Sequence, residues 1–407
     1  MEIRCGKMSR MTIDFSFPPE VDEIRFKVRS FIDEVVRPIE ERGDRESWDR
    51  GQWRDGIIGM RKAAQEWGLW LPHMPKEWGG MGLGHVAMAA VSAEAARSRM
   101  GPFAVNAQAP DEGNMHTLLH WGTDEQKQEY LKPLCQGRAR SCFAMTEPEV
   151  AGSDPTLLRT RAVRDGDSWV LNGHKWFTSG AVGASIAIVM VVTDPDAPRH
   201  RRASMILVPI DTPGFNLIRP VPVMGHAGGG GHCEIRYEDC RVPAANLLGP
   251  ESGGFEIAQA RLGPGRIHHC MRAIGGAERA LEMMCRRANS RVAFGGPLAE
   301  KQFVQEMIAA SRMEIDQARL LVLHAAWKMD TVGKKEARQE ISMIKVVAAN
   351  LFMRVLDRAI QVHGALGVSD DTPLARMWRD GRMLRLADGP DEVHKQVIAR
   401  RELARYA

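Results

Sequence analysis

The chain has 407 residues, of which 44% are hydrophobic and 26% charged, and a net charge of +4. This is an ordinary globular balance, and the charge is too small, and too little interleaved with aromatic residues, to indicate nucleic-acid binding. The seven cysteines include no C-x-x-C pair, which argues against a disulfide scaffold and against zinc, and predicts buried thiols in a reducing compartment, the cytoplasm.

The predicted elements are helices, then strands, then helices again. Apolar residues recur at helical spacing in residues 21–35, 57–67, 87–97 and 124–134. The period changes near residue 141, and strands are predicted at residues 186–192, 204–210 and 233–237. The longest apolar run, residues 181–192, is too short for a membrane span, so we expect none.

A hairpin is predicted within residues 168–178, because the pair Asn172-Gly173 supplies the positive φ angles of a tight two-residue turn. After residue 254, apolar stripes through Ile267, Phe303 and Ile341 predict long helices that pack as a bundle. The resulting prediction is an α+β fold with a helical domain in residues 1–140, a central β-barrel or sandwich domain in residues 141–250, and a helical bundle in residues 251–407.

Five short segments carry the candidate chemistry. They read PKEWGGMGL (residues 75–83), CFAMTEPEVAGSD (142–154), NGHKWFT (172–178), RVAFG followed by Gln302 (291–302) and QVHGA (361–365). Together and in this order they resemble the acyl-CoA dehydrogenase family, from about residue 20 to residue 405. The resemblance implies a C-terminal four-helix bundle, FAD as cofactor, an acyl-CoA substrate, an electron-transfer flavoprotein as electron acceptor, and a homodimer or homotetramer.

The resemblance assigns the flavin ring to two of these segments. Its contacts there would be Phe143, Met145, Thr146, Trp176, Phe177 and Thr178. Hydrogen bonds from Thr146 and the nearby backbone amides would favour the reduced flavin, and Trp176 would cover the ring, although core packing alone would also explain a tryptophan. Ser153 would lie near the substrate thioester or nucleotide; as a turn residue it needs no such role. This loop is one residue longer than the common E-P-x-x-G-S spacing.

Further cofactor contacts are implied in the C-terminal part of the chain. They are Arg291, Phe294, Gln302, Gln361, Val362, Gly364, Ala365, Pro390 and Glu392. Arg291 offers a rigid fork of donors for a diphosphate, and with Phe294 and Gln302 it would reach the FAD of a neighbouring subunit. Ala293 stands where the family usually has Thr, and Gly364 would let the backbone approach the cofactor closely.

The catalytic prediction rests on Asp388-Gly389-Pro390, which aligns with the family segment that carries the proton-abstracting Glu. Asp388 is therefore the predicted base, and burial beside an acyl chain is expected to raise its pKa. The alternative is that Asp388 caps the helix that follows Pro390. The Gly389 amide would hydrogen-bond the thioester carbonyl as charge develops. Arg266 would position the substrate or steady the base, unless it is a surface residue.

Other functions remain open on the same resemblance. A nitroalkane-oxidase-like activity also uses an Asp base. A relative that acts on DNA damage would need a strongly basic C-terminal surface. The branch with Asp-Gly-Pro-Asp-Glu-Val-His includes animal proteins fused to a kinase-like domain, which suggests phosphate elimination from a 4-phosphoacyl-CoA. Because residue 1 lies close to the first predicted helix, we expect a separate kinase in that case.

Two further histidine patterns have simpler interpretations. The adjacent pair His268-His269 does not have metal-ligand spacing, so no metal site is predicted. The glycine run 228–231, between His226 and His232, lacks the Lys-Ser/Thr of a phosphate loop and is predicted to be a mobile loop near the substrate entrance.

Overall fold

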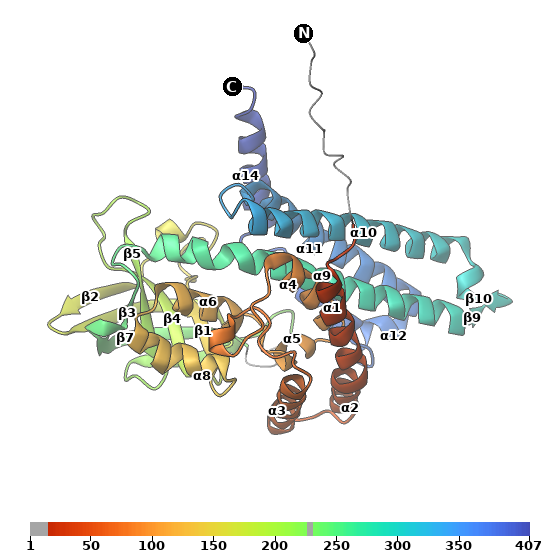
Figure 1. Cartoon of the computed structure of the whole chain (residues 1–407), viewed down its shortest axis with the longest axis horizontal. Coiled ribbons are helices and arrows are strands. Elements are labelled where there is room, and N and C mark those ends of the chain that lie inside the picture. Colours follow the sequence, from red (N-terminus) through yellow and green to blue (C-terminus); the bar gives the residue numbers. More distant parts are fainter. Residues whose placement is uncertain (1–14, 226–230) are drawn as a thin grey trace, which may run out of the picture.

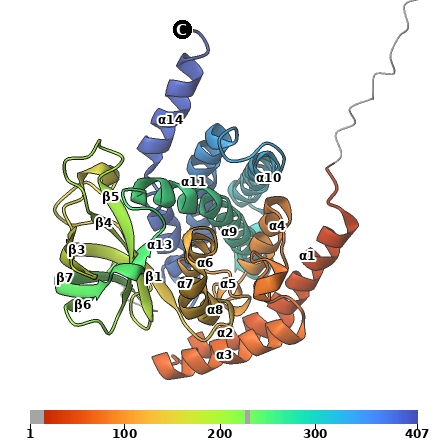
Figure 2. The same cartoon turned by 60° about the vertical axis from the view of Figure 1, so that its left-hand side comes forward.

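The computed structural model describes residues 15–225 and 231–407, and most of the glycine run 228–231 lies outside them. Figures 1 and 2 show a β-sheet on one side of the molecule, helices α6 and α8 beside it, and long helices that extend to the opposite end. No helix among the described residues is both long enough and apolar enough to span a membrane.

The N-terminal part is helical, as predicted. Its helices are α1 (Pro19–Phe31), α2 (Arg37–Arg45), α3 (Arg50–Glu66), α4 (His85–Ala95), α5 (Gly101–Ala104), α6 (Asp111–Trp121), α7 (Asp124–Gln126) and α8 (Lys132–Cys135). Helix α3 begins with a capping box, because Asp49 accepts from the Gln52 amide while the Gln52 side chain accepts from the Asp49 amide. The predicted segment 124–134 forms α7, a π-helical turn and α8 in succession.

The central part forms one eight-stranded sheet. Its strands are β1 (Ser141–Ala144), β2 (Arg161–Asp165), β3 (Ser168–Ser179), β4 (Ile186–Val192), β5 (Ala203–Pro209), β6 (Phe215–Val221), β7 (His232–Pro243) and β8 (Leu247–Leu248). The order is β6-β7-β3-β2-β4-β5-β8, with β1 parallel to β4. Every residue of β4 is buried, which explains why a continuous apolar run predicted this strand correctly. The predicted strands in β5 and β7 are also confirmed.

The predicted hairpin at Asn172-Gly173 is wrong, because both residues lie inside the single strand β3. The Asn172 side chain is held instead by Asp239, with bonds of 3.0 and 2.8 Å. A Cβ on Gly173 would lie 2.5 Å from the Thr160 hydroxyl oxygen, so the glycine permits a close approach at a register shift against β7. The tight turn lies earlier, between β2 and β3, where Gly166 has a φ of +57°.

The C-terminal part consists mainly of long helices. Its elements are α9 (Gly254–Ser290), β9 (Val292–Ala293), β10 (Gly296–Pro297), α10 (Gln302–Thr331), α11 (Arg338–His363), α12 (Ala365–Val368), α13 (Leu374–Leu384) and α14 (Asp391–Leu403). The predicted stripes of α9, α10 and α11 meet in one buried core that includes Ile267, Ile315 and Ile344. Helix α9 has 37 residues and is therefore roughly 55 Å long. It extends from the sheet to the β9–β10 hairpin (Figure 1).

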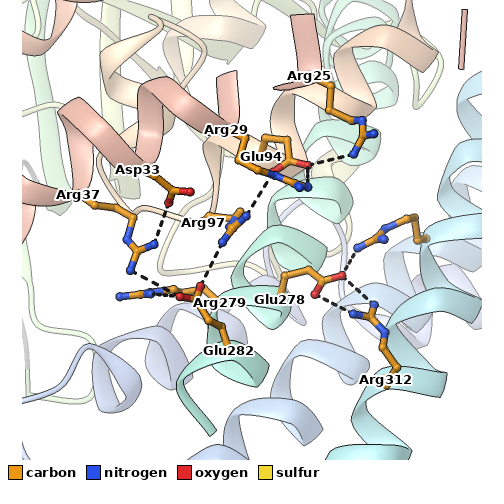
Figure 3. Close-up of polar contacts among 11 residues, drawn as sticks. Arg25, Arg29, Asp33, Arg37, Glu94, Arg97, Glu278, Arg279, Glu282 and Arg312 are labelled. Carbon is orange, nitrogen blue, oxygen red and sulfur yellow. Dashed lines mark hydrogen bonds and ion pairs between the residues drawn. The ribbon is translucent and has the colours of Figure 1, made fainter. Parts of the chain in front are cut away.

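A network of ion pairs joins the N-terminal helices to this bundle (Figure 3). On α4, Glu94 accepts from Arg29 of α1 at 2.6 Å. Arg97, in the turn that follows α4, bonds to Glu282 of α9 at 3.1 Å. Because these groups are only partly exposed and share partners, they restrict how α4 sits on α9 more than isolated surface pairs would. Helix α9 carries several residues of the site described next.

Candidate active site

Asp388 lies in the loop between α13 and α14, in a left-handed conformation with φ of +55°. Gly389 follows with φ of +100°, and a Cβ at that position would lie 3.0 Å from Nε2 of His394. The N-cap residue of α14 is Pro390, and no side chain caps the helix. The alternative that Asp388 is a helix cap is therefore wrong, because its carboxylate makes no capping hydrogen bond to α14.

The loop is held through its backbone and through Asp391. Arg266 Nε donates to the main-chain carbonyl of Asp388 at 3.0 Å, and His394 Nε2 lies 3.3 Å from the same oxygen. Asp391 is buried and accepts from Arg385 and Asn350 at 2.8 and 2.9 Å. Asp391 belongs to the Asp-Gly-Pro-Asp segment, but its anchoring role depends on contacts that the segment alone does not reveal. These bonds fix the loop through groups other than the carboxylate oxygens of Asp388.

In the polypeptide alone the pKa of Asp388 is lowered, and the expected rise beside an acyl chain stays a prediction. Burial acts to raise this pKa, but the neighbouring groups outweigh it. They are His269, whose Nε2 lies 3.3 Å from Oδ2, and the cations Arg261, Arg266 and Lys345. The first three lie on α9 and the last on α11, so the charge balance depends on helices that are distant in sequence. The carboxylate of the polypeptide alone is ionised at neutral pH.

The Gly389 amide is a free donor beside this carboxylate. Within residues 15–225 and 231–407, its N–H has no hydrogen-bond acceptor. A backbone N–H without a partner can donate to a developing oxyanion, and the role of Gly389 stays a prediction.

The predicted flavin-contacting residues are brought together by bonds between the β1 loop and β3. Thr146 Oγ1 donates to the Trp176 carbonyl at 2.7 Å, and the Trp176 amide donates to the Thr146 carbonyl at 3.1 Å. The Thr146 hydroxyl proton is thus already engaged within the chain. Phe177 is exposed, with φ of +52°, and its ring lies 4.9 Å from that of Trp176.

A buried ion pair, which the sequence analysis did not identify, supports this loop. Lys175 Nζ donates to Glu147 and to the Met145 carbonyl, each at 2.8 Å, and the two charged side chains are 0% and 1% exposed. Glu147 also accepts from the amides of Arg159 and Thr160. The available signal was a lysine at an inward-facing position of a predicted strand, which requires a buried partner.

Thr178 supplies a test of whether a cofactor fits here. Its side chain is fully buried, yet its hydroxyl has no hydrogen-bond partner among the described residues. Buried polar groups are normally paired. An unpaired hydroxyl next to Trp176, on the strand predicted to cover the flavin, fits a polar ligand such as an isoalloxazine ring.

Arg261 connects the two halves of the site and was also missed. Its guanidinium lies 4.1 Å from the centre of the Phe143 ring, and its Nε donates to Asn114 at 2.9 Å. Burial lowers the pKa of Arg261 to about 10, and its charge lowers the pKa of Asp388. Phe143 of the predicted flavin segment and Asp388 of the base loop therefore face the same arginine.

A third group of predicted residues lies elsewhere. Arg291, Phe294 and Gln302 are exposed at the far end of α9, and Phe294 is 96% exposed. Figure 1 shows their hairpin, β9–β10, at the end of the molecule opposite the sheet. Gln361, Gly364 and Ala365 are exposed where α11 ends, and Val362 is buried there. Ser153 is exposed in the loop after Glu147, and Glu392 is exposed in the first turn of α14.

Comparisons with known proteins agree with this arrangement. The family models of the acyl-CoA dehydrogenase N-terminal, middle and C-terminal domains match residues 18–138, 142–240 and 252–403. FadE2 of Mycobacterium tuberculosis, named a probable acyl-CoA dehydrogenase, is 53% identical over 351 residues, which cover 86% of each chain. The chain spans about half the length of the human relative named acyl-CoA dehydrogenase family member 11, which is 46% identical over 94% of this chain and 50% of its own.

Solved structures share the fold. A structure described as an acyl-CoA dehydrogenase from Mycobacterium abscessus superposes with a TM-score of 0.93 and 44% identity, over 97% of this chain and 100% of that one. A glutaryl-CoA dehydrogenase from Mycobacterium smegmatis in complex with FADH2 superposes with a TM-score of 0.79 and 25% identity, over 94% of each chain. The chain therefore belongs to the acyl-CoA dehydrogenase family.

Proposed function

We propose that this protein oxidises the Cα–Cβ bond of an acyl-CoA thioester with FAD as cofactor, and that Asp388 removes the α-proton. The observation that carries the proposal is a single ionised carboxylate, held by its backbone, next to the free N–H of Gly389. A thioester α-proton is weakly acidic, so its removal requires both a base and stabilisation of the enolate oxygen. These two groups supply both requirements within adjacent residues.

The residues of this chain prepare the proton step. Arg266 holds the Asp388 carbonyl, so the carboxylate is positioned without being neutralised by a direct contact with that arginine. Binding of an acyl chain would remove water from Asp388, and further desolvation raises the pKa of a carboxylate toward the range of a useful base. The low pKa of the polypeptide alone keeps the base ionised until substrate arrives.

FAD, when bound, supplies a hydride acceptor for the β-carbon. We propose that Phe143, Met145, Thr146, Trp176, Phe177 and Thr178 hold its ring, and that Ser153 lies beside the substrate. The unpaired hydroxyl of Thr178 supports this assignment. The complex of the M. smegmatis relative with FADH2 supports the choice of cofactor.

We propose a homodimer or homotetramer in which each subunit completes its neighbour's cofactor site. Arg291, Phe294 and Gln302 are separated from the sheet of their own chain by the length of α9, and so are placed to serve another subunit. Helix α10 also exposes Met313, Leu320 and Trp327, which recur every seven residues and therefore lie along one face. An exposed apolar helix face of this kind fits an interface.

Anaerobic mixing of the FAD-loaded protein with a panel of acyl-CoAs tests the function directly. We expect rapid bleaching of the flavin by at least one thioester, and reoxidation by an electron-transfer flavoprotein faster than by oxygen. Bleaching by nitroalkanes with fast reoxidation by oxygen would instead indicate the nitroalkane-oxidase-like activity. Absence of FAD from a protein that also fails to bind added FAD would refute the proposal.

The free thiols, most of them buried, suit a reducing compartment such as the cytoplasm.

The charge near Asp388 favours one second candidate, the elimination of phosphate from a 4-phosphoacyl-CoA. Arg261, Arg266 and Lys345 face one carboxylate, and such an excess of positive charge would bind an anionic acyl substituent. Turnover of straight-chain, 4-hydroxyacyl and 4-phosphoacyl thioesters should then be compared. Release of phosphate that Asp388→Asn abolishes would support this candidate, whereas oxidation of plain chains alone would leave an ordinary dehydrogenase.

A further inference from the structure

His269 lies between the carboxylate of Asp388 and the guanidinium of Arg272. Its Nε2 atom is 3.3 Å from Oδ2 of Asp388, and its Nδ1 atom is 3.3 Å from a terminal nitrogen of Arg272. Among the described residues, His269 is the one side chain with a nitrogen at this carboxylate, because Arg266 and His394 contact the main-chain carbonyl.

These contacts determine which ring nitrogen carries the proton. A guanidinium only donates hydrogen bonds, so Nδ1 of His269 must accept from Arg272. Burial lowers the pKa of His269 to about 3, and the ring is neutral at physiological pH. A neutral imidazole has one N–H. That proton is therefore on Nε2, the nitrogen that lies 3.3 Å from Oδ2 of Asp388.

Arg272 is itself fixed by the N-terminal helices. Its NH1 atom donates to the Ala107 carbonyl and to Glu112 Oε2, each at 2.9 Å. Glu112 belongs to α6 and is 3% exposed, and its other oxygen contacts His268. The series Glu112, Arg272, His269 and Asp388 thus connects a buried carboxylate of the N-terminal part to the base loop.

We propose that His269 is a positioning residue for the catalytic base: its Nε2–H donates to Asp388, and Arg272, held by Glu112, fixes the tautomer that makes this donation. The proposal rests on the proposed role of Asp388. A donor to the charged form of a carboxylate stabilises that form, and it also orients the carboxylate. Once Asp388 has taken up the substrate proton, the bond weakens, which favours release of the proton for the next turnover.

The pH profile of kcat/KM tests the donation, because its acidic limb reports the base of the free enzyme. Other groups that act on Asp388 stay in place in the variants: Arg261, Arg266 and Arg272 on α9, Lys345 on α11 and His394 on α14. We expect His269→Leu to move the limb upward by about one pH unit, the change that loss of a charge-assisted hydrogen bond produces. His269→Gln keeps an N–H donor at the Nε2 position and should keep the limb low.

His120→Leu is the matched control, since His120 is exposed on α6 and bonds to the His116 carbonyl. The acidic limb of its kcat/KM profile should coincide with that of the unmodified enzyme. The proposal would be overturned if His269→Leu had the same acidic limb as the unmodified enzyme, or if the Leu and Gln variants of His269 shifted the limb upward equally.

A nitrogen-15 NMR spectrum of the histidine rings tests the tautomer without any substrate. The His269 signals, identified by their loss in His269→Gln, should show a protonated Nε2 and an unprotonated Nδ1. The reverse tautomer would overturn the proposal whatever the activity. If no acyl-CoA bleaches the unmodified enzyme, the proposed function fails, but the NMR result still decides the hydrogen bond.

Discussion

Arg266 Nε donates to the backbone carbonyl of Asp388 at 3.0 Å, so the direct contact between these two residues runs through the main chain and not through the carboxylate. The bond supports a loop residue with a φ of +55°, a backbone conformation that residues other than glycine rarely adopt. It also leaves the carboxylate free to accept a proton. Substitution of the Asp388 side chain should therefore remove the chemistry while the loop and the binding site persist.

Asp388→Asn should retain FAD and acyl-CoA binding and slow flavin bleaching by at least about 10² to 10⁴, the usual contribution of a positioned base. Stopped-flow bleaching and FAD content measure the two properties separately. Asp388→Glu is the informative companion, since the longer carboxylate should restore part of the rate. Near-normal bleaching by the Asn variant would place the base elsewhere.

Gly389→Ala should impair both stability and catalysis. The φ of +100° strains any residue with a Cβ, and that Cβ would meet His394 at 3.0 Å, which together cost about 1–3 kcal/mol. The amide that we assign to the thioester carbonyl would also move. Gly166→Ala provides the control, because Gly166 has a φ of +57° in a turn with nothing within 4 Å of its Cβ position. A Gly389→Ala enzyme with unchanged bleaching would exclude the amide from the reaction.

The periodicity of apolar residues predicted the long helices and the most buried strand, since each presents an uninterrupted pattern to the core. The turn chemistry of Asn172-Gly173 predicted a hairpin wrongly, because the sequence cannot distinguish a glycine that turns the chain from one that admits Thr160. In the second case the deciding contact comes from Thr160, the residue before β2. Local turn chemistry is then overridden by tertiary packing.

The site was predictable to the extent that it consists of contiguous motifs. The direction of the Asp388 pKa shift was not predictable, because it depends on Arg261, His269 and Lys345. These residues come from two helices distant in sequence from the loop. Glu112 was missed for the same reason. A buried carboxylate in a helix indicates that a partner exists, but only the packing of α6 on α9 identifies Arg272 as that partner.

The buried pair of Glu147 and Lys175 makes a prediction about stability. Lys175→Met leaves the Glu147 carboxylate buried without its cation, which should cost about 3–5 kcal/mol. Adding Glu147→Gln should recover part of that loss, because the uncompensated charge disappears. Urea denaturation of the two variants and of the unmodified protein measures both changes. A double variant no more stable than Lys175→Met alone would show that the charge is not the cause.

The same pair predicts that the stabilities of the unmodified protein and of the Lys175→Met variant respond differently to pH. Burial acts to raise the pKa of Glu147, but Lys175 and the Thr160 bonds outweigh it, so the pKa is lowered. A carboxyl with a lowered folded-state pKa stabilises the fold above its unfolded-state pKa, and this contribution is lost as the pH falls through the folded-state value. Without Lys175 the folded-state pKa should be raised, so the Lys175→Met variant should gain stability relative to the unmodified protein as the pH falls from 7 to 5. Parallel stability curves would contradict this explanation.

The final prediction concerns assembly. Arg291 is exposed beside the β9–β10 hairpin, at the end of α9 that lies opposite the sheet (Figure 1). If it binds the diphosphate of a neighbour's FAD, Arg291→Ala should weaken FAD retention and assembly together, because cofactor and subunit then stabilise one another. Gel filtration with light scattering, at rising protein concentration and with or without added FAD, measures both effects. Arg286→Ala is the control, since Arg286 is an exposed arginine of the same helix whose side chain pairs with Glu282. Excess FAD should restore assembly of the Arg291 variant. A monomer that retains FAD tightly would contradict the shared site, since all contacts would then come from a single chain.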